Sequence, residues 1–206
     1  GGGTWRFADG RVDVNQYKAD VPVGDGVMWR VQADGEQTAA RLYTGPMYMK
    51  YNLVLRGMGA GEGSKIHEQF AKVCKGNKYS TTLHVINSAI IKLAKLTVAT
   101  NVYRGVSGAL LPRPFWTANE FDVKGGVEFG FMSTTLEYDV AHAYASQAGA
   151  AATIFEIQQG MVDRGADISF LSQYPHEKEI LLSPLTGLEV QSMRIDGAVL
   201  VVEVKL

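Results

Sequence analysis

The stretch FGFMSTT, residues 129–135, places two aromatic residues and a methionine before three hydroxyl side chains, Ser133, Thr134 and Thr135. Short apolar segments bounded by glycine and polar residues are typical of β-strands. Consecutive hydroxyls after a strand indicate either a polar site or the cap of a following helix, and Thr135 is placed to cap a helix around residues 137–148. The stretch therefore predicts a strand that ends at a candidate site.

Strand patterns extend from this stretch in both directions. Residues 98–206 contain β-branched and aromatic runs with Gly, Asp or Pro between them, and one helical segment, EYDVAHAYASQAG, interrupts the runs. The predicted strands are VATNVYRGV, GVEFGFMSTT, AATIFEIQQ, KEILLSPLTGLEVQSMRI and GAVLVVEVKL. This half of the chain is expected to form a core that is mostly β-sheet.

Residues 36–97 carry helical patterns instead. In EQTAARLYTGPMYMKYNLVLRGM, the pair Gly45 and Pro46 predicts a break between two helices, because proline cannot continue a helix. The glycine-rich GMGAGEGS at 57–64 predicts a turn or linker, and KIHEQFAKVC after it predicts a further helix.

The stretch STTLHVINSAIIKLAKLT is the clearest helix of the chain, and Ser80 or Thr82 can cap it. Its apolar stripe comprises Leu83, Ile86, Ile90, Leu93 and Leu96. Residues 1–34 show no long helical period and are expected to be loops with short strands. The sequence thus predicts an α+β fold in one integrated domain, with a lead-in and helical lobe over 1–97 and a β core over 98–206.

Composition and charge exclude several classes of protein. Hydrophobic residues make up 46% and charged residues 20% of the 206 residues, which is typical of a globular protein. The balance of 20 basic against 21 acidic residues gives no reason to expect nucleic acid or a membrane as partner. No apolar run approaches the roughly 20 residues of a membrane span, the opening GGGTWRFADG lacks a signal-peptide pattern, and Cys74 is the single cysteine. These features favour a cytoplasmic location. The chain can be a fragment of a longer protein.

The four histidines give no sign of a metal site, because they lack the spacing of metal ligands. His67 and Glu68 begin a pattern like HExxH, but Ala71 stands where the second histidine belongs. We therefore expect no metal.

Two further motifs accompany the hydroxyl run in the β half. VYRG at 102–105 places Arg104 at the end of an apolar strand, directly before Gly105, and EKEILL at 177–182 places Glu177 and Glu179 at the start of another strand. Taken singly, each motif has a simpler explanation. A strand-end arginine is usually a surface ion-pair partner, and glutamates that flank a lysine often protect a strand edge.

In their order and spacing, however, the three motifs resemble the R-S-E signature of the cholera-toxin-like mono-ADP-ribosyltransferases. The resemblance covers about residues 100–206, and the stretches LYTGPMYMKYN, LRG and KGNKYSTTLHVINSAI resemble the helical lobe of eukaryotic members. It implies a split β-sandwich that binds NAD, the substrate, in the cleft between its sheets. No G-x-G-x-x-G follows a predicted strand, so a Rossmann mode of NAD binding is not expected.

The residue types suggest a role for each side chain that would bind NAD. Arg104 would clamp the pyrophosphate, because a guanidinium binds phosphate oxygens in bidentate fashion, and Gly105 would let the backbone approach the ligand. Ser133 would hold the catalytic glutamate in place. Thr134 and Thr135 would support it or contact the nicotinamide ribose.

Glu179 is the expected catalytic residue, because a carboxylate on the ribose 2′-hydroxyl stabilises the oxocarbenium-like charge that develops when nicotinamide leaves. Glu177 lies two residues earlier and is expected on the same face of the strand, where the two carboxylates can hold a sugar and a nucleophile side by side. In the family, E-x-E accompanies arginine acceptors and Q-x-E accompanies asparagine-type acceptors, so E-K-E implies arginine. Tyr144 and Tyr174 can stack on nicotinamide or adenine, although core packing is the simpler explanation for Tyr144.

Three functions remain open from the sequence. The first is transfer of ADP-ribose from NAD to arginine side chains of an acceptor protein, with loop 168–176 meeting that protein. The second is NAD glycohydrolysis, in which water is the acceptor and Glu177 orients it. The third is a module that binds NAD or a protein partner without turnover, against which the intact Glu179 argues.

Overall fold

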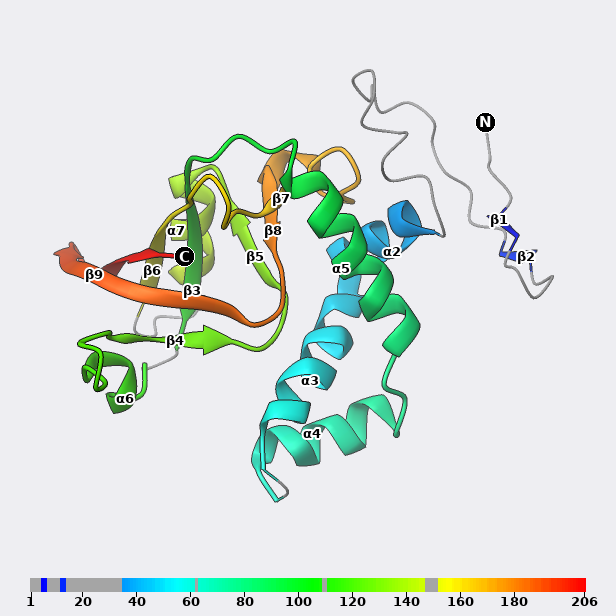
Figure 1. Cartoon of the computed structure of the whole chain (residues 1–206), viewed down its shortest axis with the longest axis horizontal. Coiled ribbons are helices and arrows are strands. Elements are labelled where there is room, and N and C mark those ends of the chain that lie inside the picture. Colours follow the sequence, from blue (N-terminus) through cyan, green and yellow to red (C-terminus); the bar gives the residue numbers. More distant parts are fainter. Residues whose placement is uncertain (1–4, 7–11, 14–34, 62, 109–110, 147–151) are drawn as a thin grey trace.

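Figure 1 shows a computed structural model of the chain, which describes residues 5–6, 12–13, 35–61, 63–108, 111–146 and 152–206. Of the lead-in predicted as loops and short strands, the structure describes two antiparallel strands, β1 (Trp5–Arg6) and β2 (Val12–Asp13). The rest of that prediction lies outside the described residues.

The helical lobe follows the predicted order. It comprises α2 (Glu36–Leu42), the π-helical turn η1 (Tyr43–Met47), α3 (Tyr48–Gly59), α4 (Lys65–Cys74) and α5 (Ser80–Ala94). The predicted break is confirmed, because Gly45 has a non-helical backbone (φ −95°, ψ −170°) directly before Pro46. The hydroxyl of Ser64 accepts a hydrogen bond from the amide of His67 and so caps α4.

Two details of the helix predictions are wrong. The predicted caps of α5 do not form, because Tyr79 enters the helix from a left-handed conformation (φ 48°) without a side-chain cap and Ser80 is already helical. The helix ends at Ala94, so Leu96 lies beyond it and is 44% exposed. The buried residues of α5 are Ile86, Ala89, Ile90 and Leu93.

The β half forms an eight-stranded sheet in the order β4-β9-β10-β6-β3-β5-β8-β7. Its strands are β3 (Asn101–Ser107), β4 (Gly125–Glu128), β5 (Met132–Thr135), β6 (Ala152–Gln158), β7 (Ala166–Asp167), β8 (Glu179–Leu182), β9 (Thr186–Asp196) and β10 (Val199–Lys205). Neighbouring strands are antiparallel except for β10 and β6. One residue pair, Tyr103 with Thr135, joins β3 to β5, so the sheet divides there into a larger part and the part β5-β8-β7.

Two predicted strands are each broken into two. The predicted strand 126–135 is divided between β4 and β5, because β4 pairs with β9 whereas β5 pairs with β8 across the division of the sheet. The long stretch that begins at Lys178 becomes β8 and β9, since Pro184 and the left-handed Leu185 (φ 63°) interrupt it.

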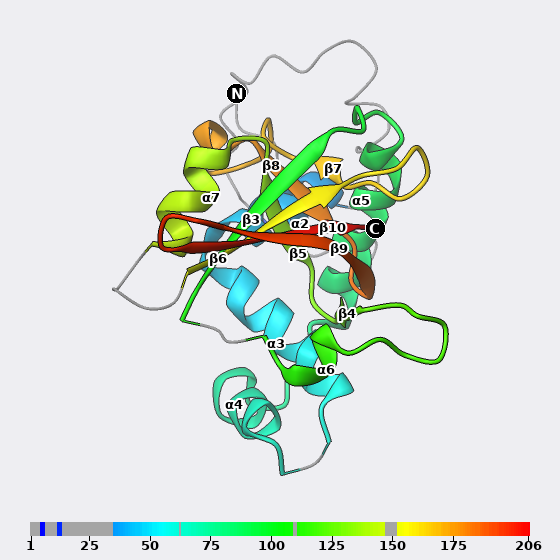
Figure 2. The same cartoon turned by 90° about the vertical axis from the view of Figure 1, so that its left-hand side faces the viewer.

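Packing of helices on the two parts of the sheet confirms the α+β class. One core cluster joins buried residues of α2 and α5 to Phe131, Ile168 and Leu181, so the helical lobe covers the β5-β8-β7 part. On the larger part, α6 (Arg113–Trp116) contributes Phe115 to one cluster, and α7 (Tyr138–Ala145) packs against β3 and β6 in another. Figure 1 shows α7 beside β3, the helices α2, α3 and α5 on the side of β5 and β8, and α6 by β4. Figure 2 shows the same arrangement turned by 90°.

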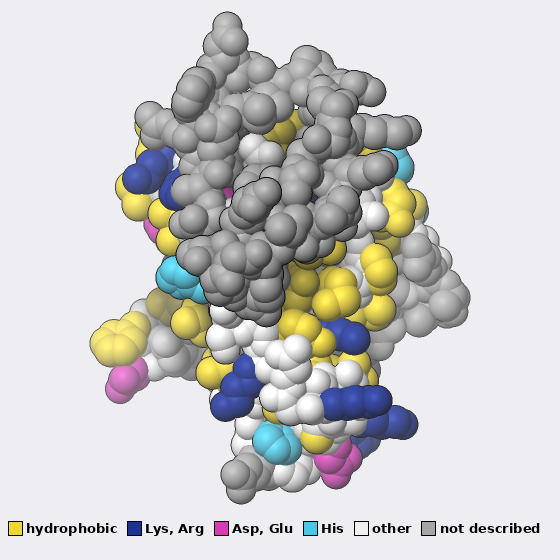
Figure 3. All heavy atoms as spheres, turned by 90° about the vertical axis from the view of Figure 1, so that its right-hand side faces the viewer, with side chains coloured by type: hydrophobic (Ala, Val, Ile, Leu, Met, Phe, Trp, Pro, Cys, Tyr) yellow, Lys and Arg dark blue, Asp and Glu magenta, His cyan; other side chains and the backbone are white. Residues whose placement is uncertain are grey.

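The side of the molecule that carries the helical lobe is drawn in Figure 3, where basic side chains gather toward the end occupied by α4. Lys65, Lys72 and Lys75 are exposed on and just after this helix. Among the described residues, no helix combines the length and the apolar character that a membrane span needs.

Candidate active site

The three sequence motifs meet at the division of the sheet. Arg104 lies in the middle of β3, so its predicted place at a strand end is wrong, because β3 continues to Ser107 in its pairing with β6. Ser133 lies on β5 and Glu179 at the start of β8, and all three residues line one cavity of about 580 Å³. The helical lobe closes this cavity with side chains of α3 and η1, among them Asn52 and Arg56. Its volume is that of ordinary small-molecule sites.

Glu179 is a buried carboxyl group, 5% exposed, held by Ser133. The Ser133 hydroxyl donates a hydrogen bond of 2.6 Å to Oε1 of Glu179. Burial raises the pKa of Glu179 to about 7, and the charge of Glu177 acts in the same direction, while Ser133 and Arg104 oppose the shift. Such a displaced carboxyl pKa inside a cavity is typical of functional sites.

This raised pKa makes the protein less stable at alkaline pH, which gives a first testable prediction. The folded-state pKa lies above the ordinary 4.5, so folding favours the protonated form, and that contribution is lost as pH rises through about 7. We expect Glu179→Gln to gain about 2–3 kcal/mol in unfolding free energy over wild type at pH 8. At pH 5 the two proteins should differ little.

Urea unfolding at pH 5 and pH 8 measures this difference. The exposed Glu120 provides the control, since Glu120→Gln should give the same difference from wild type at both pH values. A Glu179→Gln difference that does not grow between pH 5 and pH 8 would contradict the raised pKa.

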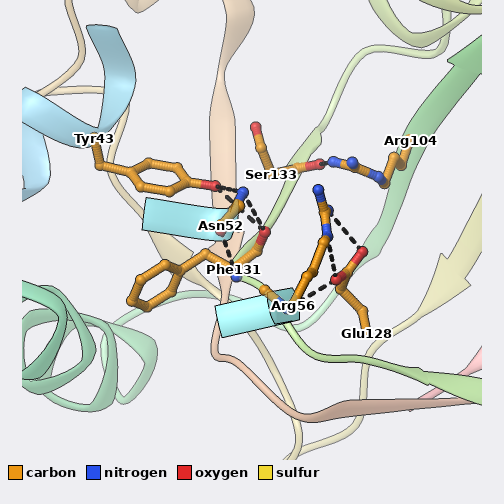
Figure 4. Close-up of polar contacts among 8 residues, drawn as sticks. Tyr43, Asn52, Arg56, Arg104, Glu128, Phe131 and Ser133 are labelled. Atoms are coloured by element: carbon orange, nitrogen blue, oxygen red, sulfur yellow. Dashed lines mark hydrogen bonds and ion pairs between the residues drawn. The ribbon is translucent and has the colours of Figure 1, made fainter. Parts of the chain in front are cut away.

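Arg104 and Arg56 bring two guanidinium groups to the same cavity wall. Nη1 of Arg104 donates to the carbonyl oxygen of Ser133 at 2.7 Å, and burial lowers the pKa of Arg104, although an arginine stays charged. Arg56 is held by Glu128, since its Nε and Nη2 each donate to one carboxylate oxygen at 2.9 Å. Figure 4 shows the side chain of Arg56 directed toward that of Arg104.

Glu128 is the group that fixes Arg56. It also accepts a hydrogen bond of 2.8 Å from the amide of Gly130. Burial pushes the pKa of Glu128 upward, but the hydrogen bonds from Arg56 and Gly130 outweigh it and hold the pKa below its usual range. The same ion pair raises the pKa of Arg56. Both partners are therefore charged in the folded protein.

A buried network ties the helical lobe to the strand that carries Ser133. The amide group of Asn52 binds both backbone groups of Phe131, accepting from its N–H at 2.8 Å and donating to its carbonyl oxygen at 3.2 Å. It also donates to the hydroxyl of Tyr43 at 3.2 Å, as Figure 4 shows. Residue 131 is thus fixed two positions before Ser133.

Three residues of the site, Asn52, Arg56 and Glu128, were not predicted from the sequence. The signal for Asn52 and Arg56 was present in the stretch MYMKYNLVLRG, which resembles the family but is not diagnostic by itself. Glu128 had no signal, because it stands in a strand whose contact with α3 only the fold reveals.

Glu177 does not share a strand with Glu179, so the predicted geometry of the pair is wrong. Glu177 ends the 3-10 helix η3 (Pro175–Glu177), and Lys178 then adopts a left-handed conformation (φ 45°, ψ 54°) before β8 begins at Glu179. The alternation of a strand therefore does not apply. Both carboxylates nevertheless line the same cavity, and Glu177 is the more exposed of the two.

The two threonines of the hydroxyl run are bonded to backbone. Thr134 donates to the carbonyl oxygen of Ile180, and Thr135 donates to that of Glu177, both at 2.6 Å. Thr135 also accepts a hydrogen bond from the amide of Glu137. It does not cap α7 as predicted, because the helix begins at Tyr138 and its N-cap residue is Glu137, which makes no side-chain cap. Both threonines thus support the segment that carries the glutamates.

The structure gives a reason for glycine at position 105 that differs from the predicted one, the close approach of a ligand to the backbone. A Cβ atom built on it would lie 1.9 Å from the carbonyl oxygen of Ala141 and 2.8 Å from the amide nitrogen of Ala145, both in α7. The glycine is therefore required because α7 packs closely on β3. Gly105 still contributes to the lining of the cavity.

Tyr144 and Tyr174 both lie at the rim of the cavity, and each is 48% exposed. Core packing is therefore the wrong explanation for Tyr144, whose hydroxyl donates to Oε1 of Glu177 at 2.7 Å. Tyr174 packs edge-to-face on His176, with ring centroids 6.3 Å apart. The structure thus gathers every predicted site residue around one cavity.

Other candidate sites carry less chemistry. A second cavity of about 570 Å³ lies by the end of α5 and the β8–β9 turn, and none of the predicted site residues lines it. Within the ranges that the structure describes, no group of three or more His, Cys, Asp or Glu side chains could hold a metal ion.

Comparison with known proteins gives a family match over nearly the whole chain. The family described as NAD:arginine ADP-ribosyltransferase (ART) matches residues 14–205. Secreted exoenzyme S of Pseudomonas aeruginosa is 27% identical over 194 residues, which cover 86% of this chain and 37% of that protein. The chain thus spans little more than a third of this relative.

Solved structures show the same fold. The ADP-ribosyltransferase HopU1 of Pseudomonas syringae pv. Tomato DC3000 superposes with a TM-score of 0.62 at 25% identity, covering 82% of this chain and 75% of that one. Exoenzyme S in complex with human 14-3-3 protein beta, bound to carba-NAD, gives a TM-score of 0.59 at 24% identity, covering 85% and 74%.

Proposed function

This chain belongs to the NAD:arginine ADP-ribosyltransferases, mono-ADP-ribosyltransferases whose substrate is NAD, and we propose that it transfers ADP-ribose to arginine side chains of an acceptor protein. The observation that carries the arginine assignment is the pair of carboxylates on one cavity, with Glu179 buried and Glu177 at the rim. In this proposal, Glu179 would act on the NAD ribose and Glu177 would bind a cationic acceptor that arrives from solvent.

The arginines would bind the NAD pyrophosphate. Arg104 keeps N–H donors beyond the one that binds Ser133, and Arg56 is held in a fixed orientation by Glu128. Two fixed guanidinium groups directed toward each other can bind a doubly charged pyrophosphate without first losing much side-chain freedom. Carba-NAD bound to exoenzyme S supports NAD as the ligand of this chain.

Glu179 would act on the ribose of the bound nicotinamide nucleoside. Its free carboxylate oxygen can accept a hydrogen bond from the 2′-hydroxyl, while Ser133 holds the other oxygen. The bond from ribose C1 to the nicotinamide nitrogen breaks, and its electron pair leaves with nicotinamide, which becomes neutral. No general acid is needed, and the buried carboxylate stabilises the cationic ribose at short range.

Glu177 would receive the acceptor. A carboxylate pairs with the planar guanidinium of arginine, so that one nitrogen is held beside C1. That nitrogen forms the new bond to C1 and loses a proton, which the Glu177 carboxylate can accept and pass to water. Exoenzyme S, crystallised with human 14-3-3 protein beta, is a relative that binds another protein. We propose that loop 168–176 meets the acceptor protein here.

Water is the competing acceptor, which makes NAD glycohydrolysis the second candidate. The observation that favours it is the exposure of the rim, where Tyr144 and Tyr174 are each 48% exposed and water can reach the ribose. In this case, Glu177 would orient a water molecule in place of the guanidine.

Glu177→Gln separates the two acceptors. We expect this variant to lose at least about 100-fold in transfer to agmatine, a soluble guanidine, because glutamine cannot pair with the cation or take its proton. Release of nicotinamide without agmatine should fall by less than about tenfold, since Glu179 and the arginines remain. Liquid chromatography of ADP-ribosyl-agmatine and nicotinamide in the same reactions measures both.

The exposed Glu120 again provides the control, since Glu120→Gln should match wild type in both products. Equal losses of adduct and nicotinamide in Glu177→Gln would assign Glu177 to bond cleavage and remove the support for the arginine proposal.

A further inference from the structure

Tyr144 makes a contact that the reaction described above does not use. Its hydroxyl donates to Oε1 of Glu177 at 2.7 Å, although nearly half of the side chain is exposed to solvent. The other tyrosine of the same helix, Tyr138, donates to Asp196 at 3.2 Å and takes no part in the lining of the cavity. Tyr144 is thus the tyrosine of α7 that faces the site.

The backbone around Glu177 is already held by other groups. The hydroxyl of Thr135 donates to the carbonyl oxygen of Glu177 at 2.6 Å, and the amide of Glu177 donates to the carbonyl oxygen of Tyr174 at 3.0 Å. The next residue, Lys178, forms an ion pair with Glu137 just before α7. What remains to be fixed is the direction of the Glu177 side chain.

Tyr144 supplies that constraint. A long, partly exposed glutamate has several rotamers of similar energy, and a hydrogen bond to Oε1 favours those that keep the carboxylate over the cavity. The bond occupies Oε1 from the side of α7. Since a carboxylate accepts hydrogen bonds on both oxygens, Oε2 stays available to a guanidinium N–H.

We propose that Tyr144 is a positioning residue for the acceptor step, holding the Glu177 carboxylate toward the incoming guanidine and thereby setting how ADP-ribose divides between guanidine and water. The inference rests on the proposed transfer to arginine. In this role Tyr144 acts on binding of the acceptor, whereas a tyrosine that stacks on a ring of NAD would act on binding of NAD.

The substitution Tyr144→Phe tests this role, because it removes the hydroxyl and keeps the ring. We expect the KM for agmatine to rise about five- to tenfold, in line with the loss of one partly exposed hydrogen bond. The KM for NAD and the rate of nicotinamide release without agmatine should change by less than about threefold. The hydrolysed share of ADP-ribose should therefore rise at a fixed agmatine concentration.

The matched control is Tyr138→Phe, which removes a hydroxyl from the same helix on the side of Asp196. It should leave the KM for agmatine and the hydrolysed share at their wild-type values. Thermal unfolding of both variants, measured alongside, checks that neither result reflects a loosened helix.

Three outcomes overturn the inference, and they differ from one another. If Tyr144→Phe keeps the wild-type KM for agmatine, the hydroxyl does not position the acceptor. If it raises the KM for NAD by as much as that for agmatine, Tyr144 belongs to NAD binding. If wild-type protein releases nicotinamide but modifies no guanidine, the proposed function itself fails, and this role of Tyr144 fails with it.

Discussion

Replacing Glu179 with glutamine is expected to lower the rate of nicotinamide release from NAD by at least about a thousandfold. Glutamine has the same shape and can keep the contact with the Ser133 hydroxyl, which lies 2.6 Å from Oε1 in the wild-type protein. It lacks the negative charge that would stabilise the cationic ribose in a buried site. The loss should therefore appear in kcat, with little change in the affinity for NAD.

The rate is measured by chromatography of nicotinamide, and NAD affinity by calorimetry with carba-NAD, which exoenzyme S binds in its crystal structure. Glu120→Gln, with its carboxylate exposed away from the cavity, should show the wild-type rate and affinity. If Glu179→Gln keeps a tenth or more of the wild-type rate, Glu179 is not the carboxylate on which bond cleavage depends.

A large loss of stability is expected for Gly105→Ala. The added Cβ would lie 1.9 Å from the carbonyl oxygen of Ala141, a backbone atom that cannot turn away as a side chain could. Helix α7 is held against β3 by the buried Ala141 and Ala145, so the whole helix must shift. We expect a loss of about 3–4 kcal/mol in unfolding free energy, at the upper end of overpacking effects.

Gly187→Ala is the matched control for this measurement, because a Cβ at position 187 meets nothing within 4 Å. Urea unfolding should place this variant within about 0.5 kcal/mol of wild type. A loss of less than about 1 kcal/mol for Gly105→Ala would mean that α7 packs on β3 with more room than the structure gives it.

The sequence alone was enough to propose Arg104, Ser133 and Glu179 as site residues, and the structure brings them to one cavity. Arg104 and Ser133 stand within strands and Glu179 at the start of one, and the hydroxyl run, the arginine and the glutamate pair keep a family order along the chain. The helix break at Gly45 was equally visible, because proline acts on the backbone locally. The break depends on neighbouring residues alone, and the order of the motifs can be read along the chain without knowledge of contacts between distant segments.

Features that depend on contacts between distant segments could not be predicted. The need for Gly105 comes from α7, which follows it by more than thirty residues, and the grip of Asn52 on Phe131 joins residues 79 apart. The prediction that Glu177 and Glu179 share a strand failed because Lys178 between them is left-handed, and nothing in E-K-E marks the end of a 3-10 turn. The exposure of Tyr144 likewise follows from how α7 lies on the sheet.

Transfer of ADP-ribose to a guanidine is tested most directly by the balance of products from NAD and excess agmatine. The amount of ADP-ribosyl-agmatine, measured by mass spectrometry, is compared with the amount of nicotinamide that the purified wild-type protein releases. We predict that the adduct accounts for most of the nicotinamide at saturating agmatine. Nicotinamide accompanied by free ADP-ribose, with no adduct, would contradict the arginine proposal and make the protein a NAD glycohydrolase. If no nicotinamide is released at all, the protein is better described as a module that binds NAD or a protein partner without turnover.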